Sequence, residues 1–158
     1  MNEFRATLEC LNSAGVDFIV VGGVAAILHG SARFTLDLDI VYDRSRPNLE
    51  RLVLALATHR PYLRGAPPGL PFLWDTATLE RGLNFTLTTQ LGDLDLLGEV
   101  TGGGGYRDML PLTEEIEVGS NTYRVVTLEK LIQLKRATGR PKDLEAIAEL
   151  EALREETE

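Results

Sequence analysis

The spacing of apolar side chains predicts several amphipathic helices along the chain. In residues 2–14, Phe4, Leu8 and Leu11 recur at helical spacing, and Gly15 follows as a C-cap. The run 24–30 favours a short helix by its Ala, Ile and Leu content, and 47–59 places leucines on one face after a proline in the first turn. Near the C-terminus, Thr127 caps a helix over 128–139, and Pro141 opens a last one over 141–156.

Between these helices lie short runs that are typical of strands. Residues 16–23 and 35–42 are rich in Val, Ile and aromatic side chains, and we expect the two strands to lie beside each other. Alternation around a glycine turn predicts a hairpin with strands at 84–88 and 93–97. Residues 114–126 predict a further hairpin around Gly119, Ser120 and Asn121.

The remaining segments complete a single predicted domain of the α+β class, 1–158, with a mixed or antiparallel sheet flanked by helices. Residues 60–71 hold four prolines and two glycines, which predicts a surface loop at the rim of a site. Residues 75–82 predict one short helix. The domain should consist of a core over about 15–126 and C-terminal helices over 127–156.

Composition limits the partners and the location that we expect. The net charge of −8 argues against an extended DNA-binding or RNA-binding face, although a local basic patch can still hold a small substrate or an RNA end. The apolar run FIVVGGVAAIL is broken by glycines and is shorter than the ~20 residues of a membrane span. Because the N-terminus also lacks a signal-peptide pattern, we expect a cytoplasmic protein without membrane contact.

Two carboxylates on one strand indicate a bound cation. Side chains of a strand alternate between its faces, so Asp37 and Asp39 point the same way, with Leu38 and Ile40 opposite. Like charges this close repel unless a cation lies between them. The plain alternative is a solvated strand face, and the surrounding sequence favours a divalent metal ion held by carboxylate oxygens.

A glycine pair upstream indicates an anion site. The strand that ends at Gly22 and Gly23 leads into a helix whose first backbone N–H groups lack intrahelical partners. Such groups bind phosphate well, although a pair of glycines alone also fits a simple tight turn. A phosphate-binding site one strand away from two metal-binding carboxylates is typical of enzymes that catalyse phosphoryl or nucleotidyl transfer.

The stretch VVGGVAAILHGSARFTLDLDIVY resembles the minimal nucleotidyltransferases of the DNA polymerase β superfamily, and it looks most like the AbiEii-type and related stand-alone members. Their pattern runs from an apolar strand through Gly-Gly or Gly-Ser and a short helix to Asp-x-Asp. The residues that fall on the pattern are Gly22, Gly23, Ala25, His29, Gly30, Arg33, Thr35, Asp37 and Asp39. The resemblance covers about residues 15–150 and implies the polymerase β-like nucleotidyltransferase fold.

The resemblance also implies a third carboxylate and a pair of metal ions. In the family, this carboxylate lies on a later strand between apolar residues, a setting that Asp95 meets in GDLDLLG. Asp93 lies on the same face and is the alternative. Asp37, Asp39 and Asp95 would then hold two Mg²⁺ ions, with Mn²⁺ as a possible substitute.

The resemblance also implies which residues contact the nucleotide. Gly22 and Gly23 would let the backbone approach the phosphates, while Arg33 and Thr35 would lie close to the triphosphate. Further candidates are two lysines of the C-terminal helices, Lys135 and Lys142. Members with Gly-Ser use the serine hydroxyl as well, so in this chain that contact must come from the backbone or from another residue. As plain alternatives, Arg33 pairs with one of the aspartates, and the lysines are solvated or ion-paired.

The resemblance implies transfer of a nucleoside monophosphate from an NTP to an acceptor hydroxyl. We expect RNA, at the 3′ end of tRNA, as the acceptor of a toxin from a toxin–antitoxin system. One alternative is an antitoxin that adds AMP to a tyrosine of a HEPN ribonuclease. Antibiotic adenylylation is a third reading, usually associated with an additional helical domain. The last alternative is a non-catalytic module that binds nucleotides or a partner.

Overall fold

The structure is a computed structural model that describes residues 2–157, without the side chains of Asn2 and Lys142. The helices are α1 (Asn2–Ser13), α2 (Gly22–Leu28), α3 (Arg46–Leu56), α4 (Thr76–Arg81), α5 (Tyr106–Met109), α6 (Leu128–Thr138) and α7 (Pro141–Thr157). The strands are β1 (Phe18–Val21), β2 (Asp37–Tyr42), β3 (Tyr62–Leu63), β4 (Asn84–Thr89), β5 (Gly92–Leu97), β6 (Thr113–Val118) and β7 (Asn121–Val126). Short 3₁₀ helices follow α3 and α5.

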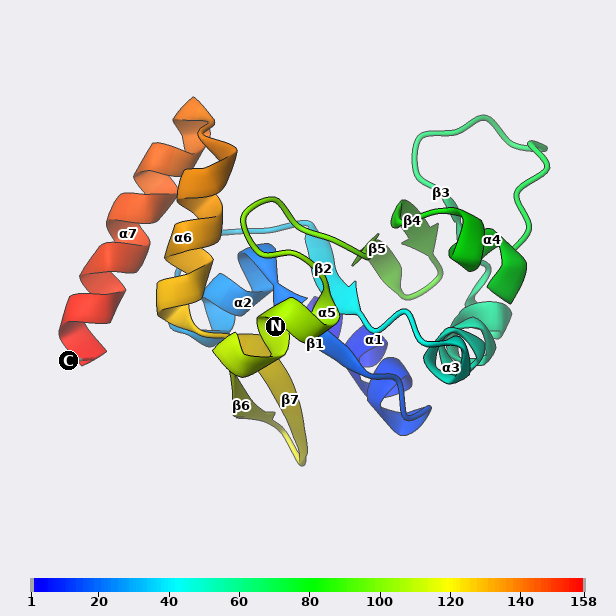
Figure 1. Cartoon of the computed structure of the whole chain (residues 1–158), viewed down its shortest axis with the longest axis horizontal. Coiled ribbons are helices and arrows are strands. Elements are labelled where there is room, and N and C mark those ends of the chain that lie inside the picture. The colour runs from blue at the N-terminus through cyan, green and yellow to red at the C-terminus, as the bar shows by residue number, and fades with distance from the viewer. Residues whose placement is uncertain (1, 158) are drawn as a thin grey trace.

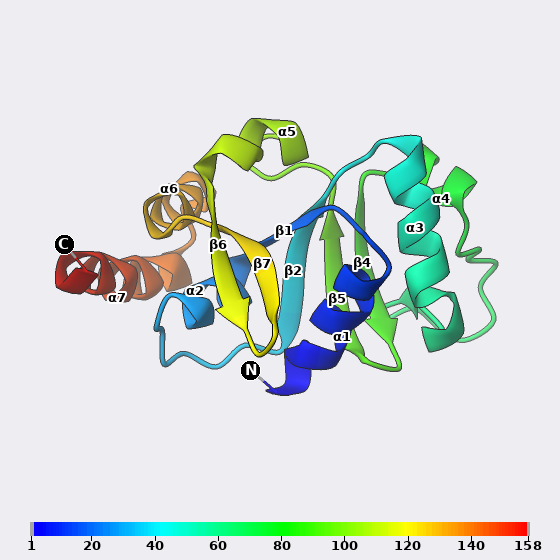
Figure 2. The same cartoon turned by 90° about the horizontal axis from the view of Figure 1, so that it is seen from below.

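The strands form one mixed sheet, which confirms the predicted α+β class. Its order is β3-β4-β5-β2-β1-β7-β6. The pairs β1–β2, β3–β4, β4–β5 and β6–β7 are antiparallel, whereas β2–β5 and β1–β7 are parallel. Figure 2 shows the sheet through the middle of the molecule, with α1 crossing in front of it. The central position of β2 places its side chains between those of β1 and β5.

The helices lie on the faces of the sheet and at the ends of the molecule. Helices α6 and α7 pack on each other at one end, and α3 and α4 lie at the other (Figure 1). Helix α1 packs against α3, while α2 lies against β1, β2 and α6. Within residues 2–157, none of the helices combines the length and the apolar character that a bilayer span requires.

Burial of alternate side chains explains why β2 and β5 present their acids. Leu38 and Ile40 of β2 are fully buried, as are Leu94 and Leu96 of β5. Each of these side chains contributes about 2 kcal/mol of hydrophobic stabilisation, so the strands cannot rotate to bury the opposite face. The aspartates between them therefore point away from this part of the core.

The helix that follows the glycine pair begins earlier than predicted. The sequence predicts a turn at the glycines and a helix from Val24, whereas α2 already begins at Gly22. Among the strands and α-helices, two were not predicted at all, namely the two-residue strand β3 and the four-residue helix α5. Elements this short show no periodicity in the sequence, and β3 lies inside the stretch that predicts a loop.

A buried asparagine ties α3 to the two central strands. The Asn48 side chain is fully buried, and its Nδ2 donates to the carbonyl oxygens of Asp17 (3.0 Å) and Asp43 (2.7 Å). Its Oδ1 accepts from the backbone N–H of Asp17 at 2.7 Å. Because Asp17 precedes β1 and Asp43 follows β2, one side chain fixes the neighbouring ends of both strands.

We expect Asn48→Ala to destabilise the fold by about 1–3 kcal/mol, because it leaves backbone groups without partners in a buried place. Urea unfolding followed by circular dichroism measures the loss. The matched control is Leu54→Ala on the same helix, whose side chain is 76% exposed and whose removal should change stability little. Equal unfolding midpoints for the two variants would contradict the role given to Asn48.

Candidate active site

The parallel register of β2 and β5 gathers four carboxylates. Asp37 lies opposite Asp93 and Asp39 lies opposite Asp95, so all four side chains share one face of the sheet. We call these four residues the carboxylate cluster. The sequence left open whether Asp93 or Asp95 accompanies the first pair. Asp95 is the direct neighbour of Asp39, and Asp93 is the neighbour of Asp37.

Asp39 is the most perturbed acid of the cluster. Burial raises the pKa of its carboxyl to about 7, and the Asp95 charge, a hydrogen bond with Asp95 and the Asp37 charge act in the same direction. The positive charge of Lys135 opposes this rise. The buried Oδ1 of Asp39 has no hydrogen-bond partner. A buried acceptor without a partner, among other carboxylates, is a feature that a bound cation would relieve.

Arg64 places a guanidinium against the other three carboxylates. Its Nη2 lies 2.8 Å from Asp95 Oδ1, its Nε 3.4 Å from Asp93 Oδ2, and its Nη1 3.6 Å from Asp37 Oδ2. Nη2 also donates to the carbonyl oxygen of Leu87 at 2.6 Å. Arg64 is not among the residues predicted for the site. The available signal was its place in the 60–71 loop, which predicted a rim around a site.

The carboxylate cluster has the donor atoms that a hard divalent cation prefers. Carboxylate oxygens suit Mg²⁺ and Mn²⁺, and the unpartnered Oδ1 of Asp39 supplies a free ligand atom. Across residues 2–157, however, no three His, Cys, Asp or Glu side chains are arranged to hold a metal ion. In the observed arrangement the guanidinium of Arg64 stands against three of the four acids instead.

The two glycines at the start of α2 allow close approach, each for its own reason. Gly22 has a φ of +66°, and a Cβ there would collide with the carboxylate of Asp39. A Cβ on Gly23 would lie 2.7 Å from the hydroxyl oxygen of Thr35. The Thr35 hydroxyl thus lies where a side chain at position 23 would stand. It supplies a hydroxyl beside the first turn of α2, where Gly-Ser members of the resembled family carry their serine.

Five of the residues predicted for the site line one cavity of about 280 Å³, which we call the α2–α7 cavity. They are Gly23, Arg33, Thr35, Asp39 and Lys135. Helix α7 forms the opposite wall with Asp143, Glu149 and Leu150. The cavity therefore brings together Gly23 of α2, Asp39 of β2, Lys135 of α6, and Arg33 and Thr35 from the segment between α2 and β2. Arg140 lines it as a third cation.

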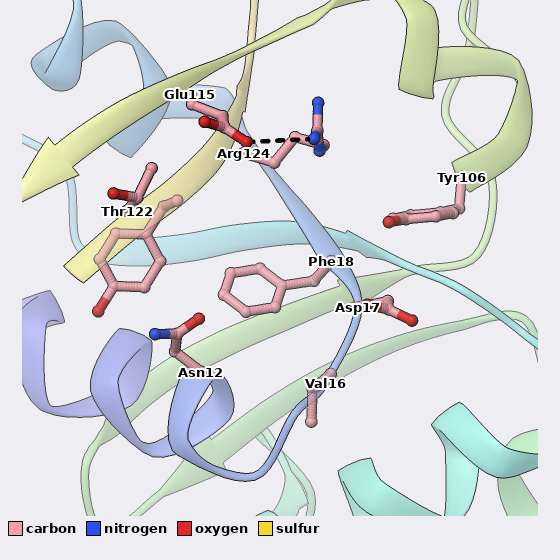
Figure 3. Close-up of a pocket in the computed structure, with 9 residues that line it drawn as sticks. Asn12, Val16, Asp17, Phe18, Tyr106, Glu115, Thr122 and Arg124 are labelled. Atoms are coloured by element: carbon pink, nitrogen blue, oxygen red, sulfur yellow. Dashed lines mark ion pairs between the residues drawn. The ribbon is translucent and has the colours of Figure 1, made fainter.

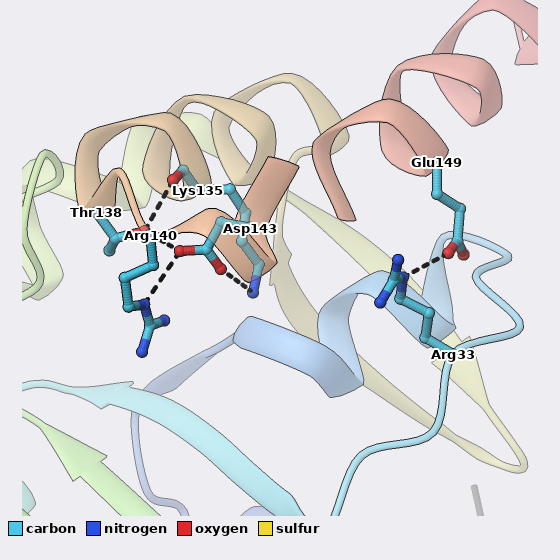
Figure 4. A network of polar contacts seen from close by, with 6 residues as sticks. All are labelled: Arg33, Lys135, Thr138, Arg140, Asp143 and Glu149. Carbon is cyan, nitrogen blue, oxygen red and sulfur yellow. Dashed lines mark hydrogen bonds and ion pairs between the residues drawn. The ribbon is translucent and has the colours of Figure 1, made fainter. Parts of the chain in front are cut away.

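Carboxylates of α7 hold the cations of this cavity (Figure 4). Arg33 Nε lies 2.8 Å from Glu149 Oε2, and its Nη2 lies 3.6 Å from Glu145 Oε2. Lys135 lies 3.9 Å from the buried side chain of Asp143. The sequence offered an ion pair between Arg33 and one of the aspartates as an alternative. In the structure, Arg33 pairs with glutamates of α7 instead. The side chain of Lys142 lies outside the described residues.

Hydrogen bonds keep these two α7 acids charged. A bond from the Thr138 hydroxyl (2.6 Å), with Arg140 and Lys135 nearby, lowers the pKa of Asp143. A hydrogen bond from the Ser31 hydroxyl, together with the nearby Arg33, lowers the pKa of Glu149. Charged acids thus face both cations at neutral pH.

A second cavity, of about 260 Å³, lies between α1, α5 and the β6–β7 hairpin (Figure 3). Phe18 and Tyr106 line it together with an ion pair of 3.6 Å between Arg124 and Glu115. None of the residues predicted for the site lines this cavity. The predicted site residues instead gather at the α2–α7 cavity and the adjoining carboxylate cluster.

Comparison with known proteins finds the same fold in nucleotidyltransferases. The lincosamide antibiotic adenylyltransferase LnuA, solved with lincomycin bound, is similar with a TM-score of 0.63 and 16% identity, over 96% of this chain and 96% of its own. A candidate nucleotidyltransferase from Thermotoga maritima, TM1012, is similar with a TM-score of 0.59 and 15% identity, over 92% and 88% of the two chains. No protein-family model and no curated protein matches the chain.

These likenesses confirm the predicted nucleotidyltransferase fold. They also change one expectation. Antibiotic adenylylation, the third reading of the sequence, is usually associated with an additional helical domain. The LnuA chain is covered over 96% of its length, so an adenylyltransferase of this kind exists without such a domain. Chain length therefore does not exclude a small-molecule acceptor.

The contact between positions 23 and 35 predicts that their substitutions are coupled. Gly23→Ser alone should destabilise the protein by about 1–3 kcal/mol, because the new Cβ would lie 2.7 Å from the Thr35 hydroxyl. Adding Thr35→Gly should restore most of the loss, because it removes the Thr35 hydroxyl and also the Thr35 Cβ, which would lie 2.8 Å from the new Cβ. Urea unfolding of both single variants and the double variant gives the coupling energy. Additive effects would show that the two side chains do not compete for one space.

The raised pKa of Asp39 predicts that the metal-free protein loses stability as the pH rises. The folded protein keeps the proton of the Asp39 carboxyl up to about pH 7, whereas the unfolded chain releases it at about pH 4. Between these values the folded state binds more protons than the unfolded state, so the free energy of unfolding falls with rising pH. Above pH 7 the full penalty of the buried charge is present.

Asp39→Asn should remove this penalty and make the metal-free protein more stable than wild type above about pH 7, with the difference vanishing toward about pH 4. Thermal unfolding in the presence of a chelator, at a series of pH values, measures it. The exposed Asp17→Asn is the control and should follow the wild-type curve. A constant difference across the pH series would refute the assignment to Asp39.

Proposed function

We propose that this chain is a divalent-metal-dependent nucleotidyltransferase, which moves a nucleoside monophosphate from an NTP to an acceptor hydroxyl. The observation that carries the proposal is the convergence of Gly23, Asp39 and two cations on one cavity, with three further carboxylates beside it. The fold shared with LnuA and TM1012 supports it. Each of these features alone has a plain structural explanation, whereas together they match the needs of one reaction.

In this proposal the acids would hold metal ions, and one of them would accept a proton. Asp37 and Asp39 would hold two Mg²⁺ ions, or Mn²⁺ in their place, and Asp95 would complete the second site. The ions supply Lewis-acid stabilisation of the phosphates and lower the pKa of the acceptor hydroxyl. The acceptor oxygen bonds to the α-phosphorus, the bond to pyrophosphate breaks, and the hydroxyl proton passes to Asp95.

The other residues of the α2–α7 cavity would bind the triphosphate. The backbone at Gly22 and Gly23 admits phosphate oxygens, and the Thr35 hydroxyl donates in place of the missing serine. Arg33 and Lys135 bring positive charge. Because both cations are paired with α7 acids, the phosphates would replace those carboxylates as their partners.

The acceptor that we propose is RNA, at the 3′ end of tRNA, in the role of a toxin. This rests on the resemblance of residues 15–150 to AbiEii-type members. The net charge of −8 confines any RNA contact to a local patch, and a 3′ end needs no more than that.

The second candidate acceptor is a small molecule that carries hydroxyl groups. The full-length likeness to LnuA, an adenylyltransferase bound to lincomycin, favours it, and an acidic protein has no electrostatic conflict with such an acceptor. The acceptor class is therefore the point on which the experiment must discriminate.

The test incubates purified protein with Mg²⁺ and each α-labelled NTP in turn, in three arms that hold total RNA, total protein or a panel of hydroxylated small molecules. We expect label in tRNA-sized RNA. Label in the small-molecule arm would instead support the second candidate, and label in a protein band would indicate an AMP-adding antitoxin. Asp37→Asn and Asp39→Asn should each lower the transfer at least about a hundredfold, while Asp17→Asn should not. Absence of label in every arm, from a folded protein, would refute nucleotidyl transfer.

A further inference from the structure

Arg64 reaches the carboxylate cluster from the end of β3, across the intervening strand β4. The residue follows β3, and its backbone N–H donates to the carbonyl oxygen of Thr86 on β4 at 3.0 Å. The side chain is 25% exposed and extends past β4 to the acids of β5 and β2. This backbone hydrogen bond and the one to Leu87 hold both ends of the residue in place.

The guanidinium of Arg64 is the cation that forms ion pairs with three acids of the cluster. In the described part of the chain, no second Lys, Arg or His forms an ion pair with Asp37, Asp93 or Asp95. Lys135 acts on Asp39 through its charge, and its own ion pair is with Asp143. Three of the four acids therefore depend on Arg64 for an ion pair, and Asp39 is influenced by the charge of Lys135.

We propose that Arg64 is the built-in counter-ion of the carboxylate cluster and that a divalent ion must displace its guanidinium from Asp95 in order to bind. The inference rests on the proposed function and deepens it. Arg64 is then a positioning residue that sets the affinity of the cluster for metal, in addition to the acids that would hold the ion.

Geometry and charge both support this competition. The Asp95 oxygen that faces Arg64 is 2.8 Å from Nη2, and a metal ion on that oxygen would meet the guanidinium at close range. Two positive charges so placed repel by several kcal/mol at the effective dielectric of a partly buried site, about 20. The carbonyl oxygen of Leu87 accepts a hydrogen bond from Nη2, so the guanidinium keeps a partner when it leaves its ion pair with Asp95.

The experiment measures metal binding to the full chain, independent of turnover. Mn²⁺ is titrated into wild type and Arg64→Met at an alkaline pH, and free Mn²⁺ is followed by electron paramagnetic resonance. We expect Arg64→Met to lower the dissociation constant about tenfold or more. Arg64→Lys keeps the positive charge without the planar guanidinium group and should lower the dissociation constant for Mn²⁺ by a smaller factor.

Two controls isolate the role of Arg64. Arg81→Met makes the same change of net charge at the exposed end of α4 and should leave Mn²⁺ binding unchanged. Thermal unfolding without metal should show Arg64→Met less stable than wild type, with the loss regained when Mn²⁺ is added. Arg64→Lys provides the same comparison should Arg64→Met fail to fold.

The possible results separate this inference from the proposed function. Tighter Mn²⁺ binding in the Arg64 variants, abolished by Asp39→Asn, supports both. Unchanged or weaker binding in folded Arg64 variants, still abolished by Asp39→Asn, overturns the displacement of Arg64 alone. Binding that does not depend on Asp39, or no binding in any variant, overturns this inference and the metal-dependent function together.

Discussion

Repulsion among carboxylates held in register on two parallel strands is the constraint around which this molecule is organised. The apolar faces of β2 and β5 must stay in the core, so the strands cannot turn Asp39 and Asp95 away from each other. Burial first, and then the charges of Asp95 and Asp37, raise the pKa of Asp39 to about 7. Arg64 offsets part of the repulsion, and the buried Oδ1 atoms of Asp39 and Asp95 are still left without a hydrogen-bond partner. Such tension is tolerated where a ligand relieves it.

The parts that the sequence predicted are those written in local patterns. Period-two alternation in residues 35–42 located β2 and assigned Asp37 and Asp39 to one face. The pair Gly22–Gly23 located the close approach to the next strand, since only a glycine tolerates a positive φ against Asp39. Thr127 as the N-cap of α6 followed from its own side chain, which accepts from the Lys130 N–H. In each case, the residues that decide the structure are neighbours in the chain.

The parts that it did not predict depend on contacts between distant segments. Arg64 is separated from Asp95 by the whole of α4 and β4, and its sequence neighbours give no sign of that partner. Asn48 appears as one polar residue in an amphipathic helix, yet it lies fully buried between strand ends. Glu149 holds Arg33 across more than a hundred residues. Pairings of this kind can be predicted only when the order of the strands in the sheet is known. The strand β3, the helix α5 and the true start of α2 were not predicted, because no local pattern in the sequence indicates them.

The contact between Gly23 and Thr35 has a consequence for how such proteins diverge. The two positions share one small volume, so a side chain at one excludes a bulky side chain at the other. A lineage can move its hydroxyl from the strand side to the helix side only if position 35 becomes smaller first, since the reverse order passes through an overpacked intermediate. The order of mutations is thereby restricted by packing alone. A motif search that reads position 23 by itself would score this chain as deficient, although the hydroxyl is present one loop away.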